Sequence, residues 1–315
     1  MRGSPPHGVL PQERGLTGEM LTGKHIAIVG GDARQLEVIK SCIEGNAKVS
    51  LIGFDNLQNP FSGAVHRELS IQFVESVDLM ILPIMGTDDH GLVDSIFTQR
   101  RIVLAEEHIS ALPDHAIIFS GMAKPYLKNL CEKYSIRLVE LLMRDDVAIY
   151  NSIPTVEGAL MLAIQNTNIT IHGSTCAVLG LGRVGMTLCR TLHALGARVK
   201  VGVRSPDQVA RAEEMGLSPF LMKDLSAQVG DLDLLFNTVP AQVVTEQVLN
   251  QMSYSCVIID LASKPGGTDF TFAEKRGIKA MLAPSLPGIV ASKTAGRILA
   301  RTITRLMAEE LGERE

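Results

Sequence analysis

The stretch CAVLGLGRVGMTLCRTLHALGARVKVGVRS, residues 176–205, contains glycines at the spacing of a phosphate-binding turn, G-x-G-x-x-G. An apolar segment precedes the turn and an amphipathic segment, residues 183–195, follows it, which predicts a strand, a tight turn and a helix. In such a unit the glycines allow the turn, the approach of a pyrophosphate and close packing, and the helix N-terminus supplies free N–H groups. We therefore expect a dinucleotide to contact Gly180, Leu181, Gly182, Arg183, Val184 and Gly185; a tight turn without a ligand is the alternative.

The second apolar segment, RVKVGVRS, ends in Arg204 and Ser205 instead of an acidic residue. An Asp or Glu at this place binds the ribose 2′-hydroxyl of NAD. A guanidinium and a hydroxyl favour a 2′-phosphate instead, because an arginine forms forked hydrogen bonds to phosphate oxygens. The sequence predicts NADP as the cofactor, with NAD as the alternative if Arg204 is only a solvated charge.

Two further apolar segments in this half of the chain end in polar residues. The segment DLDLLFNTVP ends in Asn237, Thr238, Val239 and Pro240, and SCVIIDLAS continues into the loop that carries Lys264. Because the carboxyl ends of parallel strands meet at one edge of a sheet, residues 237–240 are predicted cofactor contacts. Turn formation alone is the alternative, since Pro240 and the Gly266-Gly267 pair are typical of turns.

These residues must be positioned by two α/β domains. One series of strand, glycine turn, helix and strand begins at KHIAIVGG and continues through VDLMILPI, RIVLAEE, HAIIFSG and IRLVELL; a second series begins at CAVLGLG. This alternation predicts two Rossmann-like domains, each a doubly wound parallel sheet, with a cleft between them. Pro154 is predicted to lie in the first turn of a long bridging helix, and a C-terminal helix returns to the first domain.

The expected boundaries follow from these segments. Residues 1–19 are a flexible extension, with Met20 as an internal start, and residues 20–150 form an N-terminal domain that the helix 293–315 completes. The bridging helix covers 151–170 and the NADP-binding domain covers 171–292.

The composition excludes several classes of protein. The chain has 315 residues, a net charge of −4 and 20% charged residues, which is typical of a mildly acidic globular protein and not of a nucleic-acid or membrane-surface binder. Five cysteines without CxxC or Cys/His spacing indicate neither disulfides nor a zinc site, so we expect no metal and a reducing cytoplasm. No apolar run approaches the roughly 20 residues of a membrane span.

Six segments together resemble the large (A) subunit of dipicolinate synthase of sporulating bacilli and their relatives. They are IVGGDARQLEVI, RDDVAIYNSIPTVEGALMLAIQ, IHGS, AVLGLGRVGMTLCRTLHALGARVKVGVRS, IIDLASKPGGTDF and APSLPGIVASKTAG. The resemblance extends from Met20 to about Glu310. The chain departs from the family pattern at Ser285 and Ser292, where the family usually has Gly and Pro, and in the extension before Met20. If Ser285 adopts a positive φ, its Cβ costs energy.

The resemblance implies oxidation of dihydrodipicolinate to pyridine-2,6-dicarboxylate with hydride transfer to NADP, in the mother cell of a sporulating bacterium. It also implies a small (B) subunit as partner, which resembles flavin-dependent decarboxylases, and we expect a homo-oligomer as well. Two substrate carboxylates require basic anchors. Our candidates are Arg34, Arg144, Lys264 and Lys293, with Ser120 and Asn151 as polar contacts and His172 or Lys264 as the proton acceptor.

Two other functions stay open. An NAD(P)-dependent 2-hydroxyacid or imino-acid dehydrogenase usually needs a histidine–acid pair in the second domain, and no histidine follows His193. A nucleotide-binding scaffold without its own activity is the other. Arg34 also has an alternative interpretation, as a surface residue beside an N-capping Asp32, and Lys293 and Arg297 are either anion ligands or surface residues.

Overall fold

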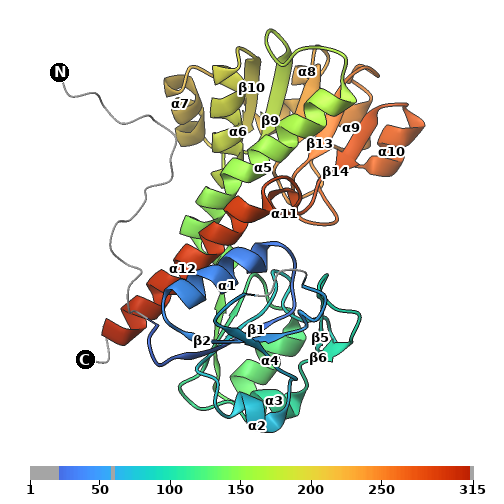
Figure 1. Cartoon of the computed structure of the whole chain (residues 1–315). Helices are drawn as coiled ribbons and strands as arrows, with labels where there is room; N and C mark the ends of the chain where they lie inside the picture. Colours follow the sequence, from blue (N-terminus) through green and yellow to red (C-terminus); the bar gives the residue numbers. More distant parts are fainter. Residues whose placement is uncertain (1–20, 58–60, 313–315) are drawn as a thin grey trace, which may run out of the picture. The chain divides into compact units, whose positions relative to one another are not determined.

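The computed structural model describes residues 21–57 and 61–312, and side chains up to residue 309 (Figure 1). The chain divides into two compact units. Unit 1 comprises residues 1–143 and 296–315, and unit 2 comprises residues 144–295. The extension predicted for residues 1–19, with Met20, lies outside the described residues.

Unit 1 contains a six-stranded sheet in the order β3-β2-β1-β4-β7-β8, and every pairing is parallel. The strands are β1 (His25–Val29), β2 (Lys48–Ile52), β3 (Ala64–His66), β4 (Leu79–Ile81), β7 (Ile117–Ser120) and β8 (Arg137–Glu140). The central strand β1 is buried along its whole length, as expected where helices cover both faces of a parallel sheet. The strand order reverses beside β1, as in doubly wound folds.

Short helices and one ribbon complete the first part of unit 1. The helices are α1 (Arg34–Glu44), α2 (Ile71–Val74), α3 (Glu106–Ser110), α4 (Pro125–Lys133) and the 3₁₀ turn η1 (Leu141–Met143). The segment RIVLAEE, expected as a strand of the parallel sheet, forms β6 (Ile102–Val103), which pairs antiparallel with β5 (Leu92–Val93). Strand propensity was correct for this segment, but its pairing depends on tertiary contacts.

The C-terminal helix α12 (Ser292–Gly312) packs against α1 in unit 1. A Cβ on Gly296 would lie 2.4 Å from the carbonyl oxygen of Arg34, so the two helices approach closely at this glycine. Nε of Arg297 is 2.7 Å from Oε2 of Glu37, which pairs a residue near the start of α12 with α1. Arg297 therefore contacts an acidic side chain of its own unit.

Unit 2 contains a second six-stranded parallel sheet, in the order β11-β10-β9-β12-β13-β14. The strands are β9 (Thr175–Leu179), β10 (Arg198–Val203), β11 (Ser218–Leu221), β12 (Leu234–Asn237), β13 (Val257–Asp260) and β14 (Lys279–Leu282). The order reverses between β9 and β12, which is the arrangement of a dinucleotide-binding fold. The prediction of two doubly wound parallel sheets is confirmed.

Helices cover both faces of this second sheet. They are α5 (Asp145–Asn166), α6 (Arg183–Ala194), α7 (Pro206–Glu214), η2 (Met222–Asp224), α8 (Leu225–Gln228), α9 (Glu246–Leu249), α10 (Phe270–Lys275) and α11 (Leu286–Val290). Alternate residues of β9 enter different cores: Cys176 and Val178 pack with α5 and α6, whereas Ala177 and Leu179 pack with α8, α9 and α10. The two-residue periodicity of a strand produces this division.

Helix α5 begins six residues before the expected start, and Pro154 lies in its interior instead of its first turn. A proline in a helix removes one backbone hydrogen bond, but Pro154 is buried in unit 2, and packing outweighs the local preference. A Cβ on Gly158 would lie 2.9 Å from Cβ of Leu286, so α5 and α11 are in close contact.

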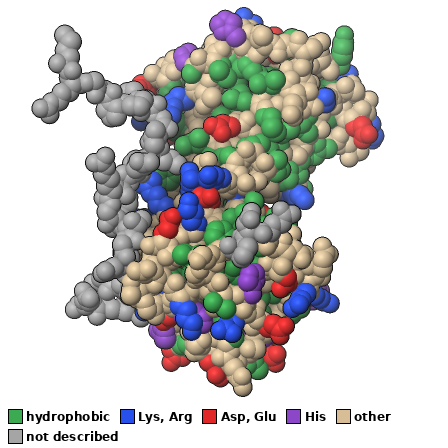
Figure 2. Space-filling view, viewed as in Figure 1, with side chains coloured by type: hydrophobic (Ala, Val, Ile, Leu, Met, Phe, Trp, Pro, Cys, Tyr) green, Lys and Arg blue, Asp and Glu red, His purple; other side chains and the backbone are tan. Residues whose placement is uncertain are grey.

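By length and composition, α5 is also the one helix of the described part of the chain that meets the requirements of a membrane span, and 39% of its apolar window is buried. Its exposed isoleucines, Ile149, Ile153 and Ile164, belong to the surface of unit 2, where apolar side chains gather on the face in view in Figure 2. Core helices of globular proteins share these properties, so they are weak evidence for a membrane.

Candidate functional site

The glycine turn of unit 2 has the geometry that a pyrophosphate requires. It follows β9, and Gly180 has φ +94°, which favours glycine. A Cβ on Gly185 would lie 2.0 Å from the carbonyl oxygen of Gly180, so this position must lack a side chain for α6 to pack on the turn. Gly182 is the N-cap of α6, and no atom lies within 4 Å of the place of its Cβ. The space at Gly182 and the free N–H groups of the first helical turn fit a dinucleotide.

The end of β10 is the place where the sequence predicts a 2′-phosphate. Arg204 is exposed, and its backbone N–H donates a hydrogen bond to Oε1 of Gln208 at 3.1 Å. Ser205 is the N-cap of α7, and its hydroxyl hydrogen-bonds to Asp207, which holds the pKa of that exposed carboxyl below its usual value. The guanidinium is therefore available for an anion, whereas the hydroxyl already has an acceptor.

The loop after β12 corrects one predicted cofactor contact. Asn237 is fully buried. Its amide donates to the carbonyl of Val239 at 3.0 Å and accepts from the N–H of Val239 at 3.0 Å. The side chain of Asn237 thus shapes the loop and is not available to a ligand. Thr238 donates to the carbonyl of Leu179 at 2.7 Å, directly before the glycine turn, and the side chains of Val239 and Pro240 are only partly buried or exposed.

The loop after β13 begins at a buried acid and carries an exposed lysine. Asp260 is fully buried, and its carboxylate accepts four hydrogen bonds, from Asn237, Ala262, Gly267 and Thr268. Lys264 is exposed at the same edge of the sheet as the glycine turn, because both follow the carboxyl ends of parallel strands. The sequence placed Lys264 at this edge but missed Asp260.

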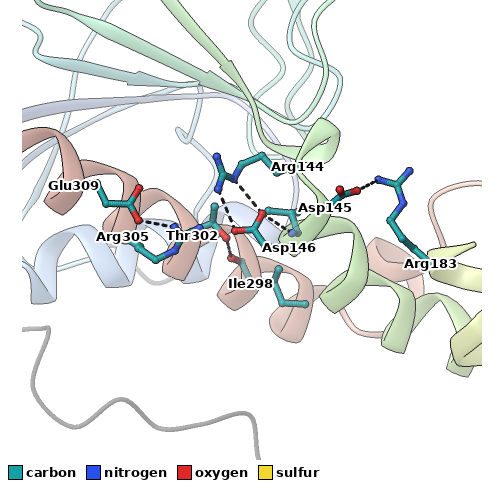
Figure 3. Close-up of polar contacts among 9 residues, drawn as sticks. Arg144, Asp145, Asp146, Arg183, Ile298, Thr302, Arg305 and Glu309 are labelled. Carbon is teal, nitrogen blue, oxygen red and sulfur yellow. Dashed lines mark hydrogen bonds and ion pairs between the residues drawn. The ribbon is translucent and has the colours of Figure 1, made fainter.

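Two arginines near the start of α5 and α6 are paired with acids of α5 (Figure 3). Nη1 of Arg183 lies 2.9 Å from Oδ1 of Asp145. Arg144, the N-cap residue of α5, forms a fork on Asp146, with Nε 3.1 Å from Oδ1 and Nη2 3.2 Å from Oδ2. An acid in the first turn of a helix is favourable by itself, so Asp146 would compete with a substrate carboxylate for Arg144.

Arg34 has a similar partner in unit 1. Its Nε lies 2.9 Å from Oδ1 of Asp32, and its side chain is 13% exposed. Burial alone would raise the pKa of Asp32, but the hydrogen bonds and charge of Arg34 outweigh burial and lower it. The predicted N-cap role of Asp32 is wrong, because Ala33 occupies that position. Asp32 and Arg34 line a small hollow of about 10 Å³, which has room for about one water molecule.

Ser120, predicted to contact the substrate, is instead fully buried at the end of β7. Its hydroxyl donates to the carbonyl of Met122 and lies 3.3 Å from the carbonyl oxygen of Pro83. This prediction is wrong for a physical reason: a buried hydroxyl must find an acceptor, and the neighbouring loop supplies one.

Two buried side-chain oxygens in the described part of the chain have no hydrogen-bond partner: Oγ1 of Thr87, in unit 1, and Oδ1 of Asn151, in α5. An unsatisfied buried oxygen is costly unless something completes it. Asn151 is a predicted substrate contact, and its orphan oxygen keeps that prediction. Thr87 gave no signal in the sequence, since a threonine in a polar loop is unremarkable by type.

His172 and Lys293 have opposite outcomes. His172 is exposed in the loop before β9, with Nδ1 3.2 Å from the carbonyl oxygen of Leu195. It therefore lies at the amino edge of the second sheet, one strand length from the glycine turn, which argues against a role as the proton acceptor. Lys293 lies in the first turn of α12 with a partly exposed side chain, and no ion pair joins it to another described side chain.

Comparison with known proteins identifies the family. Residues 25–142 match the family model for the N-terminal domain of the large (A) subunit of dipicolinate synthase, and residues 153–314 match the model "Alanine dehydrogenase/PNT, C-terminal domain". The chain is 52% identical over 290 residues to the large (A) subunit of dipicolinate synthase of Bacillus subtilis, an alignment of 92% of this chain and 98% of that protein. The chain belongs to the family of dipicolinate synthase large subunits.

Solved structures of this family agree with the fold. The crystal structure of the large subunit of dipicolinate synthase from Bacillus halodurans is 53% identical, with TM-score 0.89 over 92% of this chain and 99% of that one. The structure of the Bacillus subtilis protein is 52% identical, with TM-score 0.90 over 93% and 99%. A transhydrogenase from Sinorhizobium meliloti, 14% identical with TM-score 0.64 over 91% of this chain and 94% of that one, shares the fold alone.

Membership of this family gives unit 2 a dehydrogenase-type domain, which implies a nicotinamide nucleotide. Because the family name designates one of the subunits of a synthase, it also implies a partner subunit. The predicted resemblance is confirmed. The cleft between the domains, a homo-oligomer and the mother-cell location stay predictions.

Proposed function

We propose that this chain oxidises dihydrodipicolinate to dipicolinate with NADP as the hydride acceptor. In this reaction the substrate ring loses one hydride and one proton, and the products are the aromatic dicarboxylate, NADPH and H⁺. Family membership supports the substrate class. The observation that carries the cofactor is the exposed Arg204 at the end of β10, where no acid replaces it.

The residues of unit 2 bind and orient the cofactor. The turn 180–185 and the first N–H groups of α6 face the pyrophosphate, and Arg204 forms charge-assisted hydrogen bonds to the 2′-phosphate. Residues 238–240 border the other half of the dinucleotide. The bound nicotinamide supplies a hydride acceptor at its ring carbon, and the protein aligns the substrate C–H bond with it.

Two lysines are the best substrate anchors. Arg34 and Arg144 each hold an aspartate already, so a dicarboxylate would have to replace that partner. No ion pair joins Lys264 or Lys293 to another described side chain, and a substrate carboxylate reaches them without such a cost. With His172 at the opposite edge of the sheet, Lys264 is also the remaining proton acceptor, a role that requires its neutral amine.

The reaction is tested with the purified chain, alone and together with the small flavoprotein-like subunit that we propose as its partner. The expected result is a rise in the absorbance of reduced nicotinamide when dihydrodipicolinate and NADP are both present. Binding of NADPH without any absorbance change, with or without the small subunit, would contradict the proposal and support a nucleotide-binding scaffold.

The cofactor preference is tested by Arg204→Asp. We expect the ratio of kcat/KM for NADP to that for NAD to fall about 10- to 100-fold, because hydrogen bonds to a charged group are lost and a carboxylate repels the 2′-phosphate. The matched control is Arg190→Asp, which makes the same charge change at an exposed position of α6 and should leave the ratio unchanged. An unchanged ratio in Arg204→Asp would remove Arg204 from the site.

A further inference from the structure

Asp260, the last residue of β13, is a carboxylate with no exposed surface. Each of its oxygens accepts two hydrogen bonds. Oδ1 accepts from Nδ2 of Asn237 at 3.0 Å and from the N–H of Ala262 at 3.1 Å. Oδ2 accepts from the N–H of Gly267 at 2.8 Å and from the hydroxyl of Thr268 at 2.7 Å. A buried carboxylate is costly unless it is paired, and here four donors from two loops satisfy it.

Three of these bonds close the loop that follows β13. The donors Ala262, Gly267 and Thr268 lie at the two ends of the loop, and all three point to the one carboxylate. The residues between them, 263–265, are exposed, and Lys264 lies in their middle. Asp260 thus fixes both ends of the loop that presents Lys264 to the carboxyl edge of the sheet.

The fourth bond extends to the loop after β12. The amide of Asn237 binds Asp260 and, at the same time, the backbone of Val239. A Cβ on Gly267 would lie 2.4 Å from the carbonyl oxygen of Ala241 and 2.5 Å from Nδ2 of Asn237, so the two loops are in direct contact. A change at Asp260 must therefore disturb both loops together.

The location of these loops indicates what they serve. β12 and β13 belong to the second half of the sheet, on the other side of the reversal from β10 and Arg204. In a doubly wound fold each half of the sheet binds one mononucleotide half of the cofactor. We infer that Asp260 is a positioning residue that holds the two loops against the nicotinamide half of the dinucleotide; this inference rests on the proposed function.

The test compares two ligands in Asp260→Asn by calorimetry, without any turnover. We expect affinity for NADPH to fall about 10-fold or more, because the new amide N–H groups face the donors that the carboxylate accepted, and a charge-assisted bond is worth about a factor of ten. Affinity for the adenosine fragment, 2′-phospho-ADP-ribose, should stay within about 2-fold, since the glycine turn and Arg204 are untouched. A general loss of structure would lower both affinities.

Two variants complete the design. Thr268→Val removes one of the four hydrogen bonds and should show the same selective loss, about 3-fold, even if Asp260→Asn does not fold. Asp269→Asn, the matched control, changes the next acid along the chain, which caps α10, and should alter neither affinity. Equal losses for both ligands, or none in either variant, would overturn the inference. Failure of the unaltered protein to bind NADPH or NADH would instead overturn the proposed function, and the inference with it.

Discussion

The three glycines of the turn 180–185 meet three different physical requirements. Gly180 adopts a positive φ, Gly185 lies where a Cβ would overlap the backbone of the turn, and Gly182 borders open space. The first two positions therefore serve the fold, whereas Gly182 serves the ligand. This distinction separates stability from binding at residues three positions apart.

Replacing Gly185 and Gly182 with alanine should produce different effects. Gly185→Ala is expected to lower the free energy of unfolding by about 1–3 kcal/mol, because its Cβ would lie 2.0 Å from a backbone oxygen that has little room to move. Gly182→Ala should leave thermal stability nearly unchanged but weaken dinucleotide binding, since its methyl group occupies the approach of the pyrophosphate. Thermal unfolding and calorimetry measure the two effects; a stable Gly185→Ala that binds normally would contradict this account of the turn.

At the scale of elements, α11 begins in a conformation that disfavours its own residue. Ser285, the N-cap of α11, has φ +60° and ψ +22°, and its side chain makes no capping hydrogen bond. A left-handed conformation is uncommon for a residue with a Cβ. The expectation that a positive φ would strain Ser285 is thus met by its backbone.

Ser285→Gly should stabilise the protein by up to about 1 kcal/mol, because the left-handed conformation costs glycine nothing, although glycine gains entropy in the unfolded chain. Ser226→Gly, a change of the same type in the right-handed backbone of α8, is the control and should destabilise by about 0.5–1 kcal/mol. Urea unfolding at equilibrium measures both. A lower stability of Ser285→Gly would show that the serine side chain stabilises the turn.

For the whole molecule, the two units share one strand order but differ in their buried histidines. His25 and His108 are 7% and 8% exposed, and both belong to unit 1. Burial lowers the pKa of each below the ordinary 6.5. Nε2 of His25 lies 2.8 Å from Oγ of Ser50, and Nδ1 lies 2.8 Å from the carbonyl oxygen of Ser76. The folded unit 1 therefore binds protons less readily than its unfolded chain.

Unit 1 should lose stability in mild acid. A histidine with a lowered pKa in the folded state contributes its full stability above the unfolded pKa of about 6.5, and that contribution falls below it, by at most about 1.4 kcal/mol per pH unit for each histidine. Hydrogen exchange between pH 7.5 and 5.5 should show faster opening of β1 and β2 than of β9 and β10. His25→Gln should reduce this pH dependence, and His66→Gln, at an exposed position, should not. Equal acid sensitivity of the two units would contradict the prediction.

The sequence by itself determined the fold class, the glycine turn, the basic residue at the end of β10 and the family. These features depend on short-range chemistry: strand and helix periodicity, glycine where a turn requires it, and charge at a strand end. The tertiary structure alone decided which polar side chains are available. Ser120 and Asn237 lie at predicted positions but are used by their own loops, Arg34 and Arg144 are paired with aspartates, and Asp260 holds two loops together. The physical reason is that a buried polar group binds whatever partner the fold places beside it, and the sequence does not state that partner.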